Sequence, residues 1–246
     1  VVDLITMFLG ALLAQFSVNF KRTLACSSVS QIGFILTGIG MQSILGKESS
    51  IAASGTILHM LNHSMFKLVL FLVAGVIVQN LHALDLNEIR GFGRKKPYLM
   101  LCYLFGALGI GGIPGWSGYI SKTLLHEGIV EGIHHMHASQ TATLGLKCAE
   151  IVFLISGGIT CAYMIKLFVA VFVEKNKTNE AKMRESDQNY LSLPGKIAIG
   201  IPAVLLFVFG TFPHLFYDRF AALASGFMNA EPMAHEVAFQ SEIFRL

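Results

Sequence analysis

Six long stretches of apolar residues divide the chain, and this feature constrains its fold more than any other. The stretches lie at residues 2–18, 24–45, 51–80, 98–133, 147–173 and 196–214. Most are near the length, about 20 residues, that an α-helix needs to cross the hydrocarbon core of a bilayer. Only 13% of the residues are charged, which is about half the fraction usual in soluble domains. The sequence therefore predicts an all-α, polytopic transmembrane helix bundle of about six spans.

The fourth stretch is too long for one ordinary span, and it contains a run of helix-breaking residues from Gly111 to Gly118. Pro114 lacks a backbone N–H, and Gly112 and Gly118 weaken a helix. We therefore expect this helix to be broken between Gly111 and Gly118. A broken helix at membrane depth persists only where it is buried in protein or lines a wet cavity. The predicted break thus indicates a functional region.

Basic residues between the stretches predict which side of the membrane each loop faces. The breaks after the first, third and fifth stretches contain ten of them: Lys21, Arg22, Arg90, Arg94, Lys95, Lys96, Lys175, Lys177, Lys182 and Arg184. The breaks after the second and fourth stretches contain only Lys47, with Lys147 at the margin. Because cytoplasmic loops carry the excess of Lys and Arg, the first set of loops is predicted to be cytoplasmic.

The same patterns predict how the chain is divided. Residues 1–214 are expected to form the bundle, and the polar, mixed-charge segment 174–195 is expected to be a cytoplasmic loop within it. Residues 215–246 are apolar but interrupted by charges, which is typical of an amphipathic tail at the membrane surface. The chain opens inside an apolar run without Met, so we interpret it as a fragment of a longer protein.

Three ionisable residues recur at a four-residue step inside the third stretch: His59, His63 and Lys67. On an α-helix each such step turns the side chain only about 40°, so the three share one face and climb about 12 Å. A charge at the centre of a bilayer costs at least about 2.5–3.5 kcal/mol. Two imidazoles and an amine at this spacing predict a path for protons. The alternative is a polar trio that only packs helices together.

Lys122 follows the predicted break, four residues after Gly118. A freed helix end exposes backbone groups that can hold ions and water, so Lys122 is predicted to occupy a hydrated basic site. The alternative is a lysine whose amine reaches the outer membrane surface. Two secondary candidates are Lys166, whose side chain can reach the interface, and Asp3, either a counter-ion or a helix-end residue.

Several chemistries have no signature in the sequence. No phosphate-binding loop, dinucleotide-binding motif or Ser-His-Asp set is present, so we expect no catalytic residues and no bound cofactor. The cysteines, which lack C-x-x-C spacing, are interpreted as small apolar residues: Cys26, Cys102, Cys148 and Cys161. His134, His135 and His137 match a metal-binding tract only loosely and are interpreted as an exposed outer loop. The small net charge of +3 argues against a nucleic-acid partner, and no metal site is predicted.

Three motifs, in order, resemble those of one membrane-protein family. Residues 19–33 resemble D-x-K-R-x-L-A-Y-S-S-x-S-Q-x-G, residues 59–75 resemble H-x3-H-x-x-F-K-x-x-L-F-L-x-x-G, and residues 112–122 resemble G-I-P-x-x-x-G-F-x-S-K. These are motifs of the antiporter-like membrane subunits of complex I (NADH–quinone oxidoreductase, subunit 5/L-type), of Mrp-type sodium/proton antiporters and of energy-converting hydrogenases. The chain departs from them at Asn19, Cys26 and Tyr119, where the family usually has Asp, Tyr and Phe.

The resemblance implies that the chain is the C-terminal part of such a subunit. His59, His63 and Lys67 would belong to a central hydrophilic axis, and Lys122 would be the ionisable residue of the broken helix. The implied function is proton or cation translocation by a non-catalytic subunit of a complex I-like NADH–quinone oxidoreductase or a membrane-bound hydrogenase. Two alternatives stay open: a subunit of a non-redox Mrp-type sodium/proton antiporter, and a structural membrane subunit without a transport role.

The resemblance also implies where the chain works and with what. We expect a multi-pass protein of the bacterial inner membrane, in contact with the lipid bilayer. Its expected partners are other membrane subunits of a multisubunit pump or antiporter, and its expected cargo is protons or sodium.

Overall fold

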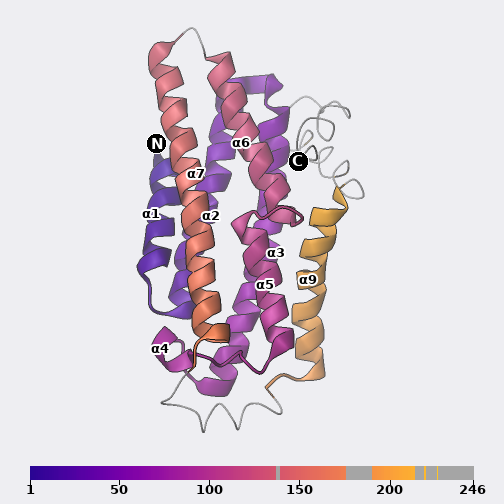
Figure 1. Ribbon diagram of the computed structural model, residues 1–246. Coiled ribbons are helices and arrows are strands. Elements are labelled where there is room, and N and C mark those ends of the chain that lie inside the picture. The colour runs from indigo at the N-terminus through magenta and orange to yellow at the C-terminus, as the bar shows by residue number, and fades with distance from the viewer. Residues whose placement is uncertain (137–138, 176–189, 214–218, 220–225, 227–246) are drawn as a thin grey trace.

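The computed structural model describes residues 1–136, 139–175 and 190–213, together with Arg219 and Gly226. The regular elements among these residues are helices that run roughly along one common axis (Figure 1). Four helical segments are long and apolar enough to cross a membrane: Phe20–Glu48, Ser50–Leu81, Gln140–Val173 and Leu193–Thr211. Two apolar helices are shorter, Val2–Phe16 and Pro97–Gly111. The predicted all-α polytopic bundle is confirmed.

Local capping explains where the first helices begin and end. α1 (Val2–Phe16) leads into α2 (Phe20–Leu45), whose first turn is capped by Asn19: the backbone N–H of Arg22 donates to the Asn19 side chain at 3.0 Å. Asparagine caps a helix as well as the aspartate expected at this position. α2 continues through the short 3-10 helix η1 (Gly46–Glu48), and α3 (Ser50–Leu81) follows.

The fourth stretch folds as two helices with an irregular segment between them, as predicted. α5 (Pro97–Gly111) begins with proline in its first turn, where the missing N–H costs nothing. Gly112 and Gly115 both have positive φ angles, 76° and 85°, which glycine adopts without strain. α6 (Ser117–His135) then continues in the same direction along the bundle axis. Figure 1 shows the break near the middle of the bundle rather than at an end.

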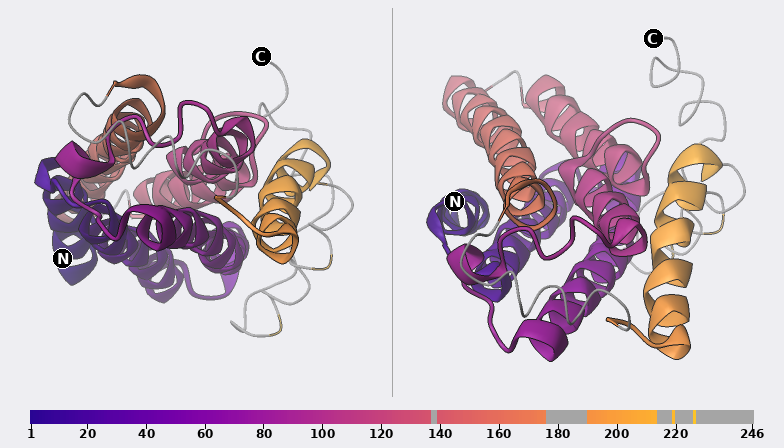
Figure 2. Two further views of the ribbon diagram at one scale, coloured as in Figure 1. Left: turned by 90° about the horizontal axis from the view of Figure 1, so that it is seen from below. Right: turned by 60° about the horizontal axis from the view of Figure 1, so that its bottom comes forward.

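The last described helices close the bundle. α7 (Gln140–Phe168) ends in a π-helical turn, η2 (Val169–Val173), beside the short helix α4 (Leu86–Ile89). Two backbone carbonyls of this turn accept hydrogen bonds from the loop after α4. The N–H of Gly91 donates to the Ala170 carbonyl and the N–H of Gly93 donates to the Val171 carbonyl, both at 2.9 Å. α9 (Leu193–Thr211) lies on the side of the bundle away from α1 (Figure 2).

Buried apolar side chains from α3, α5 and α7 form the main core. Its largest fully buried members include Phe66, Leu70, Tyr103 and Tyr163. The outward faces of the helices are also apolar, with Leu13, for example, 57% exposed. An apolar exterior around an apolar core is expected where lipid replaces water as the solvent.

The described loops sort by charge as predicted. The loops after α1 and α3, which contain or adjoin most of the described basic loop residues, lie at the lower end of Figure 1, and the loop after α2 lies at the upper end. By the positive-inside rule the lower end is cytoplasmic, and this orientation stays a prediction. The predicted polar loop at 174–195 and tail at 215–246 fall mostly outside the described residues.

Candidate functional site

α3 carries the predicted row of ionisable residues against α2 and α6. His59 is fully buried, Lys67 is 8% exposed and His63 is half-buried. A helix long enough to span the membrane therefore turns three titratable groups toward protein rather than toward lipid. That placement avoids exposing a charge to hydrocarbon, which is the costly arrangement.

His59 connects three helices. Its Nε2 lies 3.1 Å from Gln31 Oε1 on α2, and its Nδ1 lies 3.0 Å from Ser121 Oγ on α6. Ser121 Oγ is also within 3.2 Å of the Gly118 carbonyl. One turn along α3, Asn62 donates to the Ser117 carbonyl at 2.9 Å. The row on α3 is therefore joined by hydrogen bonds to the first turn of α6, directly after the break.

Both candidate lysines donate to backbone carbonyls. Lys67 Nζ lies 2.9 Å from the Leu24 carbonyl on α2, and Lys122 Nζ lies 2.8 Å from the Ile110 carbonyl at the end of α5. Lys122 Nζ also sits 4.9 Å from the centre of the Phe34 ring. Neither lysine forms a salt bridge within the described ranges. Because a carbonyl accepts a hydrogen bond from a charged or a neutral amine alike, each lysine can lose or regain a proton without losing its contact.

His63 stands between the other two residues of the row. Its Nε2 is buried and makes no hydrogen bond to protein among the described residues. A buried ring nitrogen without a protein partner is a position where a water or a proton donor is needed. The three residues thus differ in partner: carbonyl for Lys67, side chains for His59, and no protein group for His63 Nε2.

The two secondary candidates lie at the ends of α1. Lys166 Nζ on α7 donates to the carbonyls of Ala14, Gln15 and Ser17, at 3.1, 2.6 and 2.8 Å. It therefore satisfies carbonyls that the last turn of α1 leaves free. Asp3 lies in the first turn of α1, with Oδ1 2.8 Å from the Val1 amine. In the part of the chain described here, no hydrogen bond joins either residue to the row on α3.

The sequence analysis did not identify one further contact between ionisable residues, that of His126 with Glu150. His126 Nε2 on α6 lies 3.0 Å from Glu150 Oε1 on α7, and both side chains are a little under one-third exposed. His126 also lies one helical turn after Lys122, a spacing visible in the sequence. The contact with Glu150 could not be seen there, because it joins two helices and depends on how they pack.

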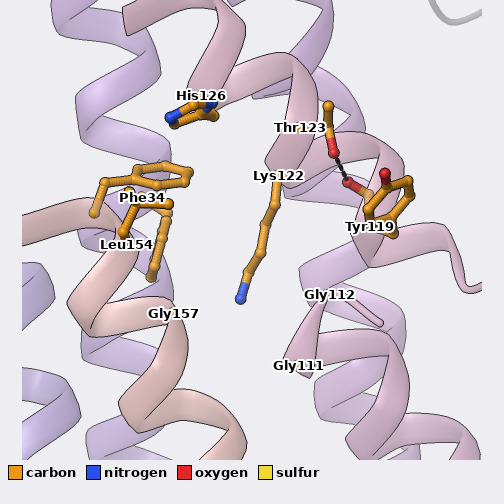
Figure 3. Close-up of a pocket in the computed structure, with 10 residues that line it drawn as sticks. Phe34, Gly111, Gly112, Tyr119, Lys122, Thr123, His126, Leu154 and Gly157 are labelled. Carbon is orange, nitrogen blue, oxygen red and sulfur yellow. Dashed lines mark hydrogen bonds between the residues drawn. The ribbon is translucent and has the colours of Figure 1, made fainter. Parts of the chain in front are cut away.

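Lys122 and His126 line one cavity of about 240 Å³. The cavity lies between the broken helix and α7, and its other walls include Gly112, Phe153 and Gly157. Figure 3 shows His126 above Lys122, with the lysine amine pointing toward the space between Gly157 and the end of α5. The predicted break therefore borders a cavity that contains a buried amine.

A second hydrogen-bonded group lies between α2 and α7. Ser27 Oγ and the Tyr163 hydroxyl are 2.6 Å apart, and both residues are fully buried. Ser27 and Gln31 are one turn apart on α2, so the face of α2 that contacts His59 is polar over two turns. These residues lie within a motif that the sequence displays, but their roles appear only once α7 is packed against them.

The site thus combines a broken helix, the row of His59, His63 and Lys67 on one face of α3, and the buried Lys122 beside the break. Residues 1–146 match the model of the family described as "NADH:quinone oxidoreductase/Mrp antiporter, TM". The chain belongs to this family, and it is a multi-pass membrane protein.

Curated relatives come from both branches that the family name joins. The chain is 30% identical over 221 residues to the Na(+)/H(+) antiporter subunit A1 of Staphylococcus haemolyticus, with 87% of this chain and 27% of the relative covered. It is 27% identical over 238 residues to NAD(P)H-quinone oxidoreductase chain 4 of a Synechococcus strain, with 96% and 40% covered. The chain thus spans well under half the length of these relatives.

A solved structure supports the fold. The Mrp complex from Dietzia contains a chain that superposes with a TM-score of 0.75 at 19% identity, covering 98% of this chain and 48% of that one. At this identity the likeness establishes the arrangement of helices alone.

Proposed function

We propose that this chain moves protons across the membrane as part of an antiporter-like subunit of a complex I-like NADH–quinone oxidoreductase or membrane-bound hydrogenase. The path runs along Lys67, His63 and His59 on α3 and reaches Lys122 at the broken helix. The observation that carries the proposal is the position of His59, whose two ring nitrogens contact Gln31 and Ser121. Ser121 directly precedes Lys122, so the row on α3 meets the break.

His59 can pass a proton on without any other reactant. An imidazole accepts a proton on one ring nitrogen and releases another from the second nitrogen. The Ser121 hydroxyl can donate either to His59 Nδ1 or to the Gly118 carbonyl, which lie 3.0 and 3.2 Å away. It therefore keeps a hydrogen bond whether His59 is neutral or protonated. A charge on one lysine disfavours a charge nearby, because Coulomb repulsion is strong where little water screens it.

The non-redox antiporter is the second candidate. It is favoured by the 30% identity to a relative named as a Na(+)/H(+) antiporter subunit. In either case we propose that the partners are other membrane subunits of a multisubunit complex. A purely structural subunit would need no titratable row inside the membrane, where placing such groups costs free energy.

Substitution of the two lysines tests the proposal in the intact complex. Lys67→Ala and Lys122→Ala are each expected to abolish proton transport into membrane vesicles, measured with a pH-sensitive dye. Lys47→Ala removes an exposed lysine from the loop after α2 and should leave transport unchanged. Assembly of each variant is checked by the yield of intact complex. Transport that survives both of the first two changes would overturn the proposal.

The driving reaction separates the two candidates. In vesicles that contain the intact complex, a redox-driven pump acidifies or alkalinises the lumen only when electron donor and quinone or another acceptor are supplied. A sodium/proton antiporter instead changes the lumenal pH when a sodium gradient is imposed without any electron donor. A response to sodium alone would favour the non-redox branch.

A further inference from the structure

Gln31 on α2 is a buried polar side chain that the row on α3 does not account for. It is fully buried inside a helix long enough to span the membrane, and its Oε1 lies 3.1 Å from His59 Nε2. The other half of its amide, Nε2, is buried and has no hydrogen-bond partner among the described residues. One half of this amide therefore holds His59, and the other half is unpaired.

The atom that Gln31 presents decides which nitrogen of neutral His59 carries the proton. A neutral imidazole has one N–H donor and one bare nitrogen, which is an acceptor. An amide oxygen only accepts, so the contact with Oε1 requires a proton on His59 Nε2. His59 Nδ1 is then bare and accepts from the Ser121 hydroxyl, 3.0 Å away. In this arrangement a proton can be added to His59 only at Nδ1, on the side of α6.

A half-turn of the amide gives a second complete set of hydrogen bonds around His59. The terminal torsion of glutamine is roughly two-fold, so the half-turn exchanges the positions of oxygen and nitrogen. The amide N–H then faces a bare His59 Nε2, and the ring proton is on Nδ1. Ser121 Oγ accepts from Nδ1–H and donates its own proton to the Gly118 carbonyl, 3.2 Å away. Both ring nitrogens of His59 are thus paired in either orientation of Gln31.

Tyr163 and Ser27 supply a partner for the amide oxygen after this turn. The Tyr163 hydroxyl lies beside the Gln31 side chain, and Ser27 is one turn before Gln31 on α2. The two hydroxyls are 2.6 Å apart, and either of them can be the donor. When Ser27 donates to Tyr163, the Tyr163 proton is available to the Gln31 oxygen. The second orientation therefore gives both halves of the amide a partner.

We propose that Gln31 is a positioning residue of the proton path, whose amide turns between these two orientations and thereby sets the tautomer of His59. The inference rests on the proposed function and adds a control point between His63 and Lys122. When the amide oxygen faces His59, a proton cannot enter from the side of His63. When the amide N–H faces His59, Nε2 is bare and entry becomes possible.

One proton passes through His59 in each such turn. A proton that arrives from His63 through water binds the bare Nε2 as the amide N–H turns away. The amide oxygen then accepts from the new Nε2–H, and the imidazolium releases its Nδ1 proton toward Ser121 and Lys122. One N–H bond forms and one breaks. No second proton enters at Nε2 until the imidazole reorients, so Gln31 prevents continuous conduction along the row.

Gln31→Met tests the amide in the intact complex. Methionine has nearly the length of glutamine and a good helix propensity, so it fills the same space without an amide. Proton transport into vesicles should fall about tenfold or more, as expected when a hydrogen bond that guides the transfer is lost. Gln42→Met, the same exchange three turns farther along α2, should transport at the parent rate. Equal transport by the two variants would overturn the inference, because Gln31 would then only pack α2 against its neighbours.

Two buried tyrosines provide a matched pair for the second orientation of the amide. Tyr163→Phe removes the hydroxyl beside Gln31, whereas Tyr103→Phe removes a hydroxyl that donates to the Met164 carbonyl at 2.9 Å. Both variants keep an aromatic ring at a fully buried position. Transport should fall about tenfold in Tyr163→Phe and stay at the parent rate in Tyr103→Phe. Equal rates would contradict the second orientation and the proposal with it.

The tautomer of His59 can be measured without transport. Solid-state NMR of isotope-labelled histidine in the intact complex separates protonated from bare ring nitrogens, and the signals lost in His59→Gln identify His59. The parent complex should show neutral His59 in both tautomers. Gln31→Glu keeps an accepting oxygen but, when ionised, has no N–H to donate, so only forms with a proton on Nε2 should remain. One and the same tautomer in both complexes would refute the proposed switch.

Failure of this inference and failure of the proposed function give different results. Parent-rate transport in Gln31→Met, together with no transport in Lys67→Ala and Lys122→Ala, would refute the role of Gln31 alone. Transport retained in both lysine variants would refute the proposed function.

Discussion

At the scale of single residues, three described lysines inside the bundle donate hydrogen bonds to backbone carbonyls. Lys67 and Lys122 each donate to one carbonyl, whereas Lys166 donates to three. A carboxylate partner would hold a lysine in its charged form, and a single carbonyl does so much less strongly. The single carbonyl partners of Lys67 and Lys122 are therefore compatible with proton exchange, whereas the three partners of Lys166 suit it to fixing the end of α1.

Lys166→Met should weaken the bundle without stopping transport. The change removes three charge-assisted hydrogen bonds at the end of α1, and loss of such contacts typically costs about 1–3 kcal/mol. Unfolding of the purified complex in a denaturing detergent should begin at a lower concentration. Transport per intact complex should equal that of the parent protein, and Lys166→Arg, which keeps a donor, should recover most of the stability. A loss of transport at unchanged stability would instead place Lys166 in the proton path.

The sequence predicts part of the site and misses another part for a physical reason. The positions of His59, His63 and Lys67 on one face follow from helical spacing, which is a local property. The contact between His126 and Glu150 joins residues on different helices, so spacing alone cannot reveal it. Gln31 and Ser121 are likewise recognisable only when α2, α3 and α6 are packed around His59.

At the scale of elements, the break between α5 and α6 depends on close backbone contact. A Cβ on Gly118 would collide with the carbonyl of Gly109, and a Cβ on Gly210 of α9 would collide with the backbone of Trp116. The Trp116 ring also packs between Phe105 and Phe207, with ring centres 4.6 and 5.2 Å away. α9 therefore braces the irregular segment from outside, and the first turn of α6 fits directly against the end of α5.

Gly118→Ala should disturb the break more than its size suggests. The added methyl group forces α5 and α6 apart, and overpacking of this kind typically costs about 1–3 kcal/mol. It should also move Ser121 and Lys122, which lie on the next turn, so transport should fall together with detergent resistance. Gly75→Ala, at a position on α3 where a Cβ meets nothing within 4 Å, is the matched control. Similar behaviour of the two variants would show that the tight contact at Gly118 is unimportant.

Helix limits were predicted well where polarity changes and less well elsewhere. Residues 51–80 correspond closely to α3 (Ser50–Leu81). α7 begins at Gln140 rather than at residue 147, because Ser139 caps a first turn that hydropathy does not distinguish from a loop. The break could be predicted because proline and glycine act on the local backbone whatever packs around them, so their positions in the sequence are enough.

At the scale of the whole molecule, charge is distributed along the bundle axis. Basic loop residues gather at the end that holds α4 and the end of α7, while the opposite end carries Glu48, Glu131 and His135. Such asymmetry is the signal that sets the orientation of membrane proteins. The row on α3 and the cavity beside Lys122 both lie between these two ends.

Reporter fusions to the full-length protein should give opposite results at the two ends. A periplasmic alkaline phosphatase fused after Lys47 is expected to be active, because that loop is predicted to be outside. The same enzyme fused after Arg94 should be inactive, while a green fluorescent reporter there should fluoresce. Activity of the phosphatase after Arg94 would show that the bundle has the reverse orientation.

The π-helical turn at Val169–Val173 fixes the register of the whole of α7. Its Ala170 and Val171 carbonyls are held by the loop that precedes α5, so α7 cannot turn about its axis without releasing that loop. Deleting one residue from the turn would rotate the helix above it by about 100° relative to this anchor. Glu150 and Gly157 would then face lipid or a different neighbour. An extra residue at the end of α7 beside α4 thus decides which side chains of α7 meet α6 toward the other end of the bundle.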